Sequence, residues 1–148
     1  MYKIIFKWVI LSISMAGSCP AGSSAINFEQ ALLTIKGVEY SIEIARTQQQ
    51  RRLGLMHRDR LGLRQGMLFV YPGIGEHRIW MKNTRIPLKV IWLDEHQSII
   101  GVKTLYPCKS SPCESYGVSR PSKYIIELNI LSGSFIPGDQ ISGLNPFN

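Results

Sequence analysis

HRIWMKNTRIPLKVIWLD, residues 77–94, is the stretch that decides the expected fold, because it sets two strand-forming runs around a polar corner. Residues 78–84 and 88–94 are rich in Ile, Val and Trp, which favours two strands flanking a corner at Arg85–Pro87. Alternation in the first strand would place Trp80 and the methionine after it on opposite faces, so both cannot enter one core.

Further strand patterns continue outward from this stretch on both sides. Residues 38–44 alternate apolar and polar side chains, which is the period of a half-buried strand. Lys36–Gly37 suits a tight turn that joins this strand to another at residues 31–35. The remaining expected elements are strands at residues 66–72, 99–107, 123–130 and within 138–144, a loop at 73–77 and a hairpin turn at 94–98.

One short helix interrupts the strand patterns. Thr47 is a suitable N-cap, the following Gln and Arg residues are good helix formers to about Leu53, and Gly54 offers a stop. Many short strands with frequent Gly and Pro turns predict a mainly β protein, either a single-domain β-sandwich or a small barrel with one short helix. A length of 148 residues fits one domain, which we place at residues 26–148.

Residues 1–25 have the composition of a secretory signal peptide. Lys3 and Lys7 form a basic start, an apolar run follows, and small residues crowd before Ala25. Cleavage after Ala25 and a lipoprotein-type site with lipidation at Cys19 both remain open, as does an uncleaved amphipathic anchor. Removing the segment lowers the net charge from +7 to +5, which favours anionic surfaces without forming a nucleic-acid-binding motif. We therefore expect export to the periplasm, the outer membrane or the medium of a bacterium.

Two cysteines remain in the expected domain, in PCKSSPCESY. In an oxidising compartment Cys108 and Cys113 should form a local disulfide. Half of a zinc site and two free thiols are the alternatives, but the three histidines are scattered and supply no matching ligand pair. The sequence therefore predicts no metal site and no cofactor.

Several motifs occur in the order of a known family: RRLGLMHRDRL, GMLFVYP, IWMKNTRIPLKVIWLD, YIIELNILSG and PGDQI. Across about residues 30–143 the chain resembles the prokaryotic family called domain of unknown function 192. The resemblance implies a compact β-rich domain, often exported, with no established activity, and it implies a functional role for Arg51. The chain departs from the family at Lys89, where relatives usually carry an acid after Pro-Leu, and in a shortened segment at residues 132–140.

Clustered arginines are one candidate for binding. Six arginines lie within nineteen residues and only Asp59 opposes them: Arg46, Arg51, Arg52, Arg58, Arg60 and Arg64. Guanidinium groups bind carboxylate or phosphate through paired N–H donors, so the cluster could hold an anion. The alternative is a solvated surface in which one arginine pairs with an internal acid such as Glu127.

The second candidate is the corner itself. Trp80 on an open face beside Asn83 and Thr84 would form a stacking platform with polar groups at its rim, suited to a sugar or peptide. Alternatively Trp80 belongs to the core and the Asn83–Thr84 pair satisfies backbone groups. Glu127 shares a strand face with Ile125 and could be a buried or recess-facing acid.

No complete catalytic set is present in the sequence. A Gly-x-Ser-x-Gly motif is missing, and no spacing singles out a pair of carboxylates for glycoside hydrolysis. We therefore expect a non-enzymatic exported domain that binds an anionic, glycan or peptide ligand, or an envelope protein, through a recess of Arg51, Trp80, Asn83, Thr84 and Glu127. A hydrolase using Glu127 or Asp94 as acid and base, and a structural subunit of a surface or secretion complex, are the alternatives.

Overall fold

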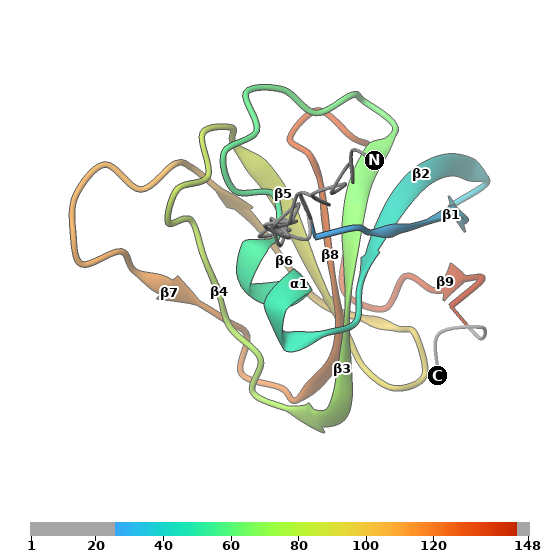
Figure 1. Cartoon of the computed structure of the whole chain (residues 1–148). Helices are drawn as coiled ribbons and strands as arrows, with labels where there is room; N and C mark the ends of the chain where they lie inside the picture. Colours follow the sequence, from blue (N-terminus) through green and yellow to red (C-terminus); the bar gives the residue numbers. More distant parts are fainter. Residues whose placement is uncertain (1–25, 145–148) are drawn as a thin grey trace, which may run out of the picture.

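A computed structural model describes residues 26–144 of the chain as one β-rich domain (Figure 1). The expected signal peptide and Cys19 lie outside the described residues, as do residues 145–148. The mainly β fold with one short helix is confirmed. Its main sheet is a single curled half-barrel rather than two sheets of similar size packed face to face.

Seven strands form the curled sheet in the order β6-β5-β8-β3-β2-β1-β9, and β4 pairs with β7 in a separate ribbon. All pairings are antiparallel except that of β2 with β3, whose connection contains helix α1 (Gln48–Leu53). The strands are β1 (Glu29–Ile35), β2 (Val38–Ala45), β3 (Gln65–Gly75), β4 (Ile79–Trp80), β5 (Leu88–Leu93), β6 (Ile99–Leu105), β7 (Ser115–Tyr116), β8 (Ser122–Asn129) and β9 (Ile141–Ser142).

Local signals in the sequence place the turn and the helix. Lys36 and Gly37 both have positive φ, as a two-residue hairpin between β1 and β2 requires. Helix α1 begins after Thr47, whose hydroxyl accepts from the Gln50 backbone N–H at 3.1 Å while the Gln50 side chain accepts from Thr47 N at 2.9 Å. Gly54 ends the helix with φ 49°. These predictions are confirmed.

Two strand boundaries differ from the predictions. Strand β3 does not end at Pro72 but continues through an irregular stretch to Gly75, where it still pairs with Ser122. The strand expected at residues 78–84 is reduced to β4, because Asn83 adopts φ 56° and Thr84 N donates back to Met81 O at 3.2 Å. A turn therefore replaces the second half of that strand.

The last residues of the described chain join the two edges of the curled sheet. Strand β9 pairs with β1, and Gln140 forms a bridge with Ser98 just before β6. Backbone hydrogen bonds from Ile99 N to Asp139 O and from Gly138 N to Ile99 O, both 2.9 Å, reinforce the contact. The strand expected within residues 138–144 is present as β9, and with the bridge at Gln140 it nearly closes one end of the half-barrel.

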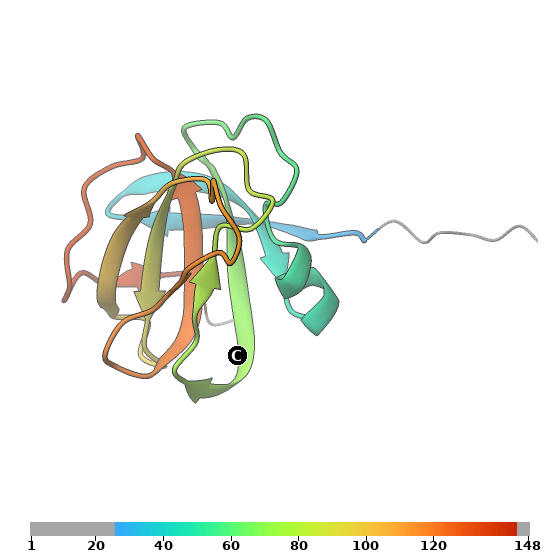
Figure 2. The same cartoon turned by 90° about the vertical axis from the view of Figure 1, so that its left-hand side faces the viewer.

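The central strands β3, β5 and β8 are buried on both faces. Their inner face lines the hollow of the curled sheet, and their outer face is covered by α1 and the β4–β7 ribbon (Figure 2). Alternation along β8 sends Ile126 to the inner core and its neighbours Ile125 and Glu127 to the outer side. No helix within residues 26–144 is long and apolar enough to cross a membrane.

Candidate functional site

Trp80 and Trp92, two tryptophans of the same stretch, have opposite environments. The Trp92 side chain is fully buried and its indole Nε1 donates to His77 O at 3.0 Å. Trp80 is 46% exposed, whereas Met81 beside it is 1% exposed. The expected split of Trp80 and Met81 between two faces is therefore confirmed, and Trp92 is the indole around which the outer core packs.

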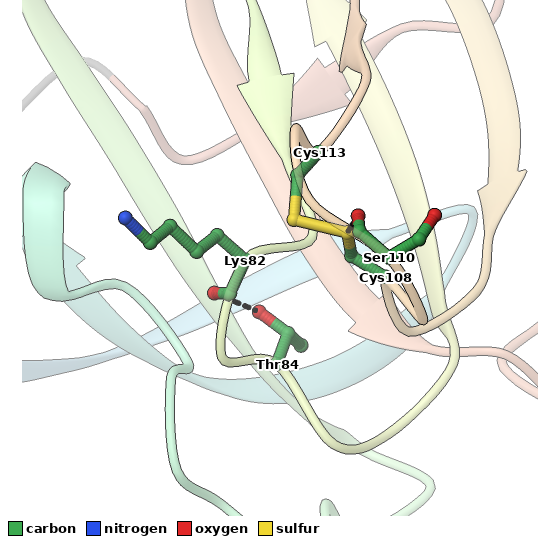
Figure 3. The surroundings of a disulfide bond; sticks show 5 residues. All are labelled: Lys82, Thr84, Cys108, Ser110 and Cys113. Atoms are coloured by element: carbon green, nitrogen blue, oxygen red, sulfur yellow. Dashed lines mark hydrogen bonds between the residues drawn. A yellow bond between two sulfur atoms is a disulfide. The ribbon is translucent and has the colours of Figure 1, made fainter.

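An open recess of about 390 Å³ adjoins the exposed indole. Its walls come from two segments that are distant in sequence, the turn after β4 and the loop closed by the disulfide (Figure 3). The lining residues are Trp80, Lys82, Asn83, Cys108, Lys109, Ser110, Ser111, Pro112 and Cys113. Its volume lies in the range of small-ligand sites.

The disulfide loop, residues 108–113, is one whole wall of this recess. Cys108 and Cys113 are bonded, with their Cα atoms 5.8 Å apart, as the sequence analysis expected. The loop is held to the opposite wall where Cys108 N donates to Met81 O at 3.4 Å. The disulfide therefore gives this wall of the recess a defined shape, because a six-residue loop without the crosslink has many more conformations.

The opposite wall depends on a left-handed turn. Asn83 has φ 56° and His57, in the segment after α1, has φ 65°. The two residues meet through a 2.8 Å hydrogen bond from His57 N to Asn83 O. Residues other than glycine adopt this left-handed backbone conformation at a cost in free energy, and Asn tolerates it better than most residues. Within the described residues the Asn83 side-chain amide has no hydrogen-bond partner, so it is available to a ligand.

The charges around the recess all have one sign. The Lys82 ammonium lies 5.2 Å from the centre of the Trp80 ring, and Lys109 lines the same space. Neither lysine forms an ion pair within residues 26–144, and none of the recess-lining residues is acidic. Uncompensated positive charge beside an exposed indole attracts an anion with a flat or apolar face.

A second, much smaller pocket lies beneath α1 and shares Trp80 with the recess. Its volume of about 20 Å³ suits roughly one water-sized group. The lining residues are Arg51, Arg52, Leu53, Gly54, Leu55, Met56, Phe69, Ile79, Trp80, Thr84 and Glu127. The structure thus brings together Arg51, Trp80, Thr84 and Glu127, whereas Asn83 lines only the open recess.

Glu127 is the most perturbed ionisable group of the site. It is 4% exposed, and its Oε2 atom has no hydrogen-bond partner in the described part of the chain. Burial raises the pKa of this carboxyl to about 8, although the positive charge of Arg58 acts in the opposite direction. At neutral pH the group is therefore largely protonated and can both donate and accept a hydrogen bond.

Arg51 has a structural role in this arrangement. Its guanidinium donates to Val70 O at 2.9 Å and to Arg46 O, and it lies 5.1 Å from the centre of the Tyr71 ring. These contacts fasten α1 to the ends of β2 and β3. Arg51 also lines the small pocket, and the functional role that the family resemblance implies for it stays a prediction.

Arg58 and Glu43 form an ion pair that was not expected from the sequence. Both guanidinium nitrogens Nη1 and Nη2 donate to the two carboxylate oxygens at 2.6 Å, which raises the pKa of Arg58. Glu43 lies opposite Met67 in β3, and Met67 lies opposite Glu127 in β8. The alternative in which one arginine of the cluster pairs with an internal acid named Glu127 as an example, whereas Arg58 pairs with Glu43. No local sequence pattern identifies that partner.

Two other residues considered earlier lie away from the site. The Asp94 carboxylate accepts from His96 N and Ser98 N at 3.0 and 2.9 Å, which closes the hairpin turn. Lys89 lies on the inner face, where its ammonium donates to Ser132 O and Gly133 O and burial lowers its pKa. The lysine that replaces the usual acid of the family therefore changes no charge at the recess. Within residues 26–144 no group of three or more His, Cys, Asp and Glu side chains is placed to hold a metal ion.

The fold and the recess define a small β-domain with a ligand-sized opening beside an exposed tryptophan. The chain belongs to the DUF192 family, described as "Uncharacterized ACR", whose model matches residues 31–136. This confirms the resemblance stated from the motifs. No curated protein matches the chain.

Two solved structures are similar to this fold. One is a protein from Sinorhizobium meliloti 1021 named as a candidate transcription regulator, with 24% identity, a TM-score of 0.65 and coverage of 82% of this chain and 98% of that chain. The other is a protein of unknown function from Novosphingobium aromaticivorans DSM 12444, with 23% identity, a TM-score of 0.63 and coverage of 87% and 94%. At this identity the likeness shows the fold alone.

Proposed function

We propose that this chain is an exported, non-enzymatic domain that binds an anionic, ring-containing ligand, such as an acidic sugar of the cell envelope, in the recess beside Trp80. The observation that carries the proposal is the surroundings of the half-exposed indole, a 390 Å³ recess whose charged side chains, Lys82 and Lys109, are both basic and unpaired within the described residues. A sugar ring can stack on the indole face while its acid group meets the lysines.

Three small probes test the charge and the ring separately. Glucuronate carries both a hydroxylated ring and a carboxylate, glucose lacks the carboxylate, and cyclohexanecarboxylate lacks the hydroxyls. We expect the two acids to shift the Trp80 indole N–H signal in NMR spectra and glucose to shift it far less. The Trp92 indole is buried and bonded to His77 O, so its signal should stay in place. Equal shifts at both indoles, or none at either, would contradict the proposal.

Charge reversal provides the matched control. Lys82→Glu should weaken binding of both acids by about ten-fold, because it places a negative charge beside the ligand's own. Lys103→Glu makes the same change at an exposed lysine of β6 that lines neither the recess nor the small pocket. It should leave the affinity within about two-fold, apart from a general effect of net charge that raised salt removes.

Export is supported by the composition of residues 1–25 together with a disulfide in an exposed loop, a combination typical of proteins that act outside the cytosol. Expression of the full chain in a Gram-negative host, followed by fractionation and mass measurement of the mature N-terminus, tests it. A chain that starts after Ala25, or a lipid-modified Cys19, is the expected outcome. Retention of Met1 in a cytosolic fraction would refute export.

A hydrolase of envelope polysaccharide or peptide is the second candidate, and the raised pKa of Glu127 favours it, since a carboxyl protonated at neutral pH can act as a general acid. Binding is better supported because the pocket at Glu127 accepts about one water and Asp94, the other candidate acid, holds a hairpin turn. Turnover of an acidic glycan or peptide panel that disappears in Glu127→Gln would reverse this preference.

A further inference from the structure

The small pocket beneath α1 and the open recess meet at a single side chain. Trp80 lines both spaces, and the rim of the small pocket also includes the exposed Arg52. The pocket is therefore not sealed within the core. A ligand that lies against the indole therefore has the small pocket next to it.

At the inner end of that pocket lies a polar group without a protein partner. The Oε2 atom of Glu127 is buried among the apolar side chains of the outer core and has no hydrogen bond within residues 26–144. Buried polar atoms are nearly always paired, and an unpaired one destabilises the fold, so an unpaired carboxyl on a residue that lines a pocket indicates a partner from outside the chain.

We propose that Glu127 forms a second subsite that receives a hydroxyl group of the same ligand whose charged group lies at Lys82 and Lys109. This inference rests on the function proposed above and specifies it further: the ligand has an acid at one end and a neutral hydrogen-bonding group at the other. A hydroxyl matches the size of the pocket, which takes about one water-sized group.

The surrounding charges favour a neutral group over an ammonium. Arg51 and Arg52 both line the small pocket, and Arg58 acts on Glu127 through its positive charge. An ammonium group in the pocket would be repelled by the positive charges of these three guanidinium groups, whereas a neutral hydroxyl would not be repelled. Since the Glu127 carboxyl is largely protonated at neutral pH, it can accept from a hydroxyl and donate to it.

Two of the walls are already fixed, so a hydroxyl entering the pocket need not order them. Arg51 is held by Val70 O, and the Gly54 backbone that ends α1 donates to Gln50 O at 2.8 Å. A subsite that is formed before the ligand arrives gains more affinity from one hydrogen bond than a subsite that must first become ordered.

The test compares glucuronate with cyclohexanecarboxylate on the wild-type chain, Glu127→Met and Glu127→Gln. The two probes share an acid and a six-membered ring and differ in their hydroxyls. We expect the wild-type chain to prefer glucuronate by about 3–10-fold, as one hydrogen bond warrants. Glu127→Met, similar in length and without hydrogen-bonding groups, should abolish this preference, and Glu127→Gln, which still donates and accepts, should keep most of it.

Each result has a separate meaning. If both acids bind equally to the wild-type chain, or the preference persists in Glu127→Met, the pocket holds only water and the subsite is refuted while the recess stands. If neither acid binds the wild-type chain, the proposed function fails and the subsite fails with it. An unchanged Trp92 indole signal in each variant reports that the outer core has kept its packing.

Discussion

The inner and outer faces of the central strands share the same backbone and differ in what their side chains can do. Ile126 and Glu127 are neighbours in β8, and both are almost fully buried. The inner face around Ile126 is an apolar core apart from Lys89, whose ammonium donates to backbone carbonyls, whereas the outer face around Glu127 combines apolar packing with an unpaired carboxyl, a nearby ion pair and openings to solvent. One face thus stabilises the sheet, and the other carries the polar groups and openings on which the proposed binding rests.

The difference arises from what covers each face. The inner core is enclosed by the curl of the sheet and by the C-terminal segment that joins its edges. The outer core is covered by a six-residue helix, a ribbon of two-residue strands and the loops that carry Leu55, Cys108 and Val118. Short elements cannot seal a sheet of this width, and the gaps between them become the recess and the small pocket.

The largest effect should come from the inner face. Ile126→Ala removes three carbons from a fully buried site and should lower the free energy of unfolding by about 4 kcal/mol, within the 2–5 kcal/mol typical of such truncations. Urea-induced unfolding measures the change. The loss should be the same at pH 5 and pH 9, since the inner core around Ile126 is apolar. A strongly pH-dependent loss would mean that the two faces are not independent.

The outer face should instead make stability depend on pH through Glu127. Its pKa is about 8 in the folded state and 4.5 ordinarily, so the folded state binds the proton more tightly. The associated stabilisation is complete below about pH 4.5 and is lost as the pH rises through about 8. A shift of this size corresponds to at most about 5 kcal/mol, and relaxation around a buried carboxylate reduces it, so we expect about 2–3 kcal/mol.

Comparison with Glu127→Gln isolates this effect, because the other ionisable groups are the same in both chains. Gln cannot ionise, so its unfolding free energy should stay level where that of the wild-type chain declines. The two chains should be similar near pH 5, and the Gln variant should be the more stable at pH 9. Parallel profiles across this range would show that Glu127 is ionised or better solvated in the folded chain.

Much of the sheet and its first connections could be predicted from the sequence. Alternation in residues 38–44, the turn at Lys36–Gly37 and the capped helix after Thr47 are local patterns, and each is present in the structure. The parallel pairing of β2 with β3 could not be predicted, because it joins strands through a connection whose path is set by packing. Strand β7 was missed because two residues carry no period.

The outer face was only partly predictable. Four of the five proposed site residues line one pocket: Trp80, Thr84, Arg51 and Glu127. Trp80 and Thr84 were chosen from the corner motif, Arg51 from the arginine cluster and the family resemblance, and Glu127 as an acid in a strand. The disulfide loop as a recess wall was missed, because it meets Trp80 only in the folded chain. The same holds for Arg58 and Glu43, which pair across fifteen residues of sequence without a helical or strand spacing.

The disulfide offers a smaller perturbation confined to the outer layer. Replacing Cys108 and Cys113 together by Ser should lower the free energy of unfolding by roughly 2 kcal/mol in the chain-entropy model. Because the loop is one wall of the recess, affinity for glucuronate should fall as well. Mild reduction of the wild-type chain should reproduce both changes. Intact affinity in the reduced chain would mean that Trp80 and Lys82 bind the ligand without that wall.

The smallest effect on stability should come from substitutions of Asn83 at the corner of the recess. They distinguish the contribution of its backbone conformation from that of its side chain. Asn83 has φ 56°, which glycine adopts freely and alanine does not. Asn83→Ala should therefore cost about 1 kcal/mol and Asn83→Gly close to nothing. Both variants lack the amide, so if that group contacts the ligand they should lose affinity for glucuronate to the same extent. Should only Asn83→Ala bind more weakly, Asn83 would serve the recess through its backbone turn, and the ligand contacts would lie with Trp80 and the lysines.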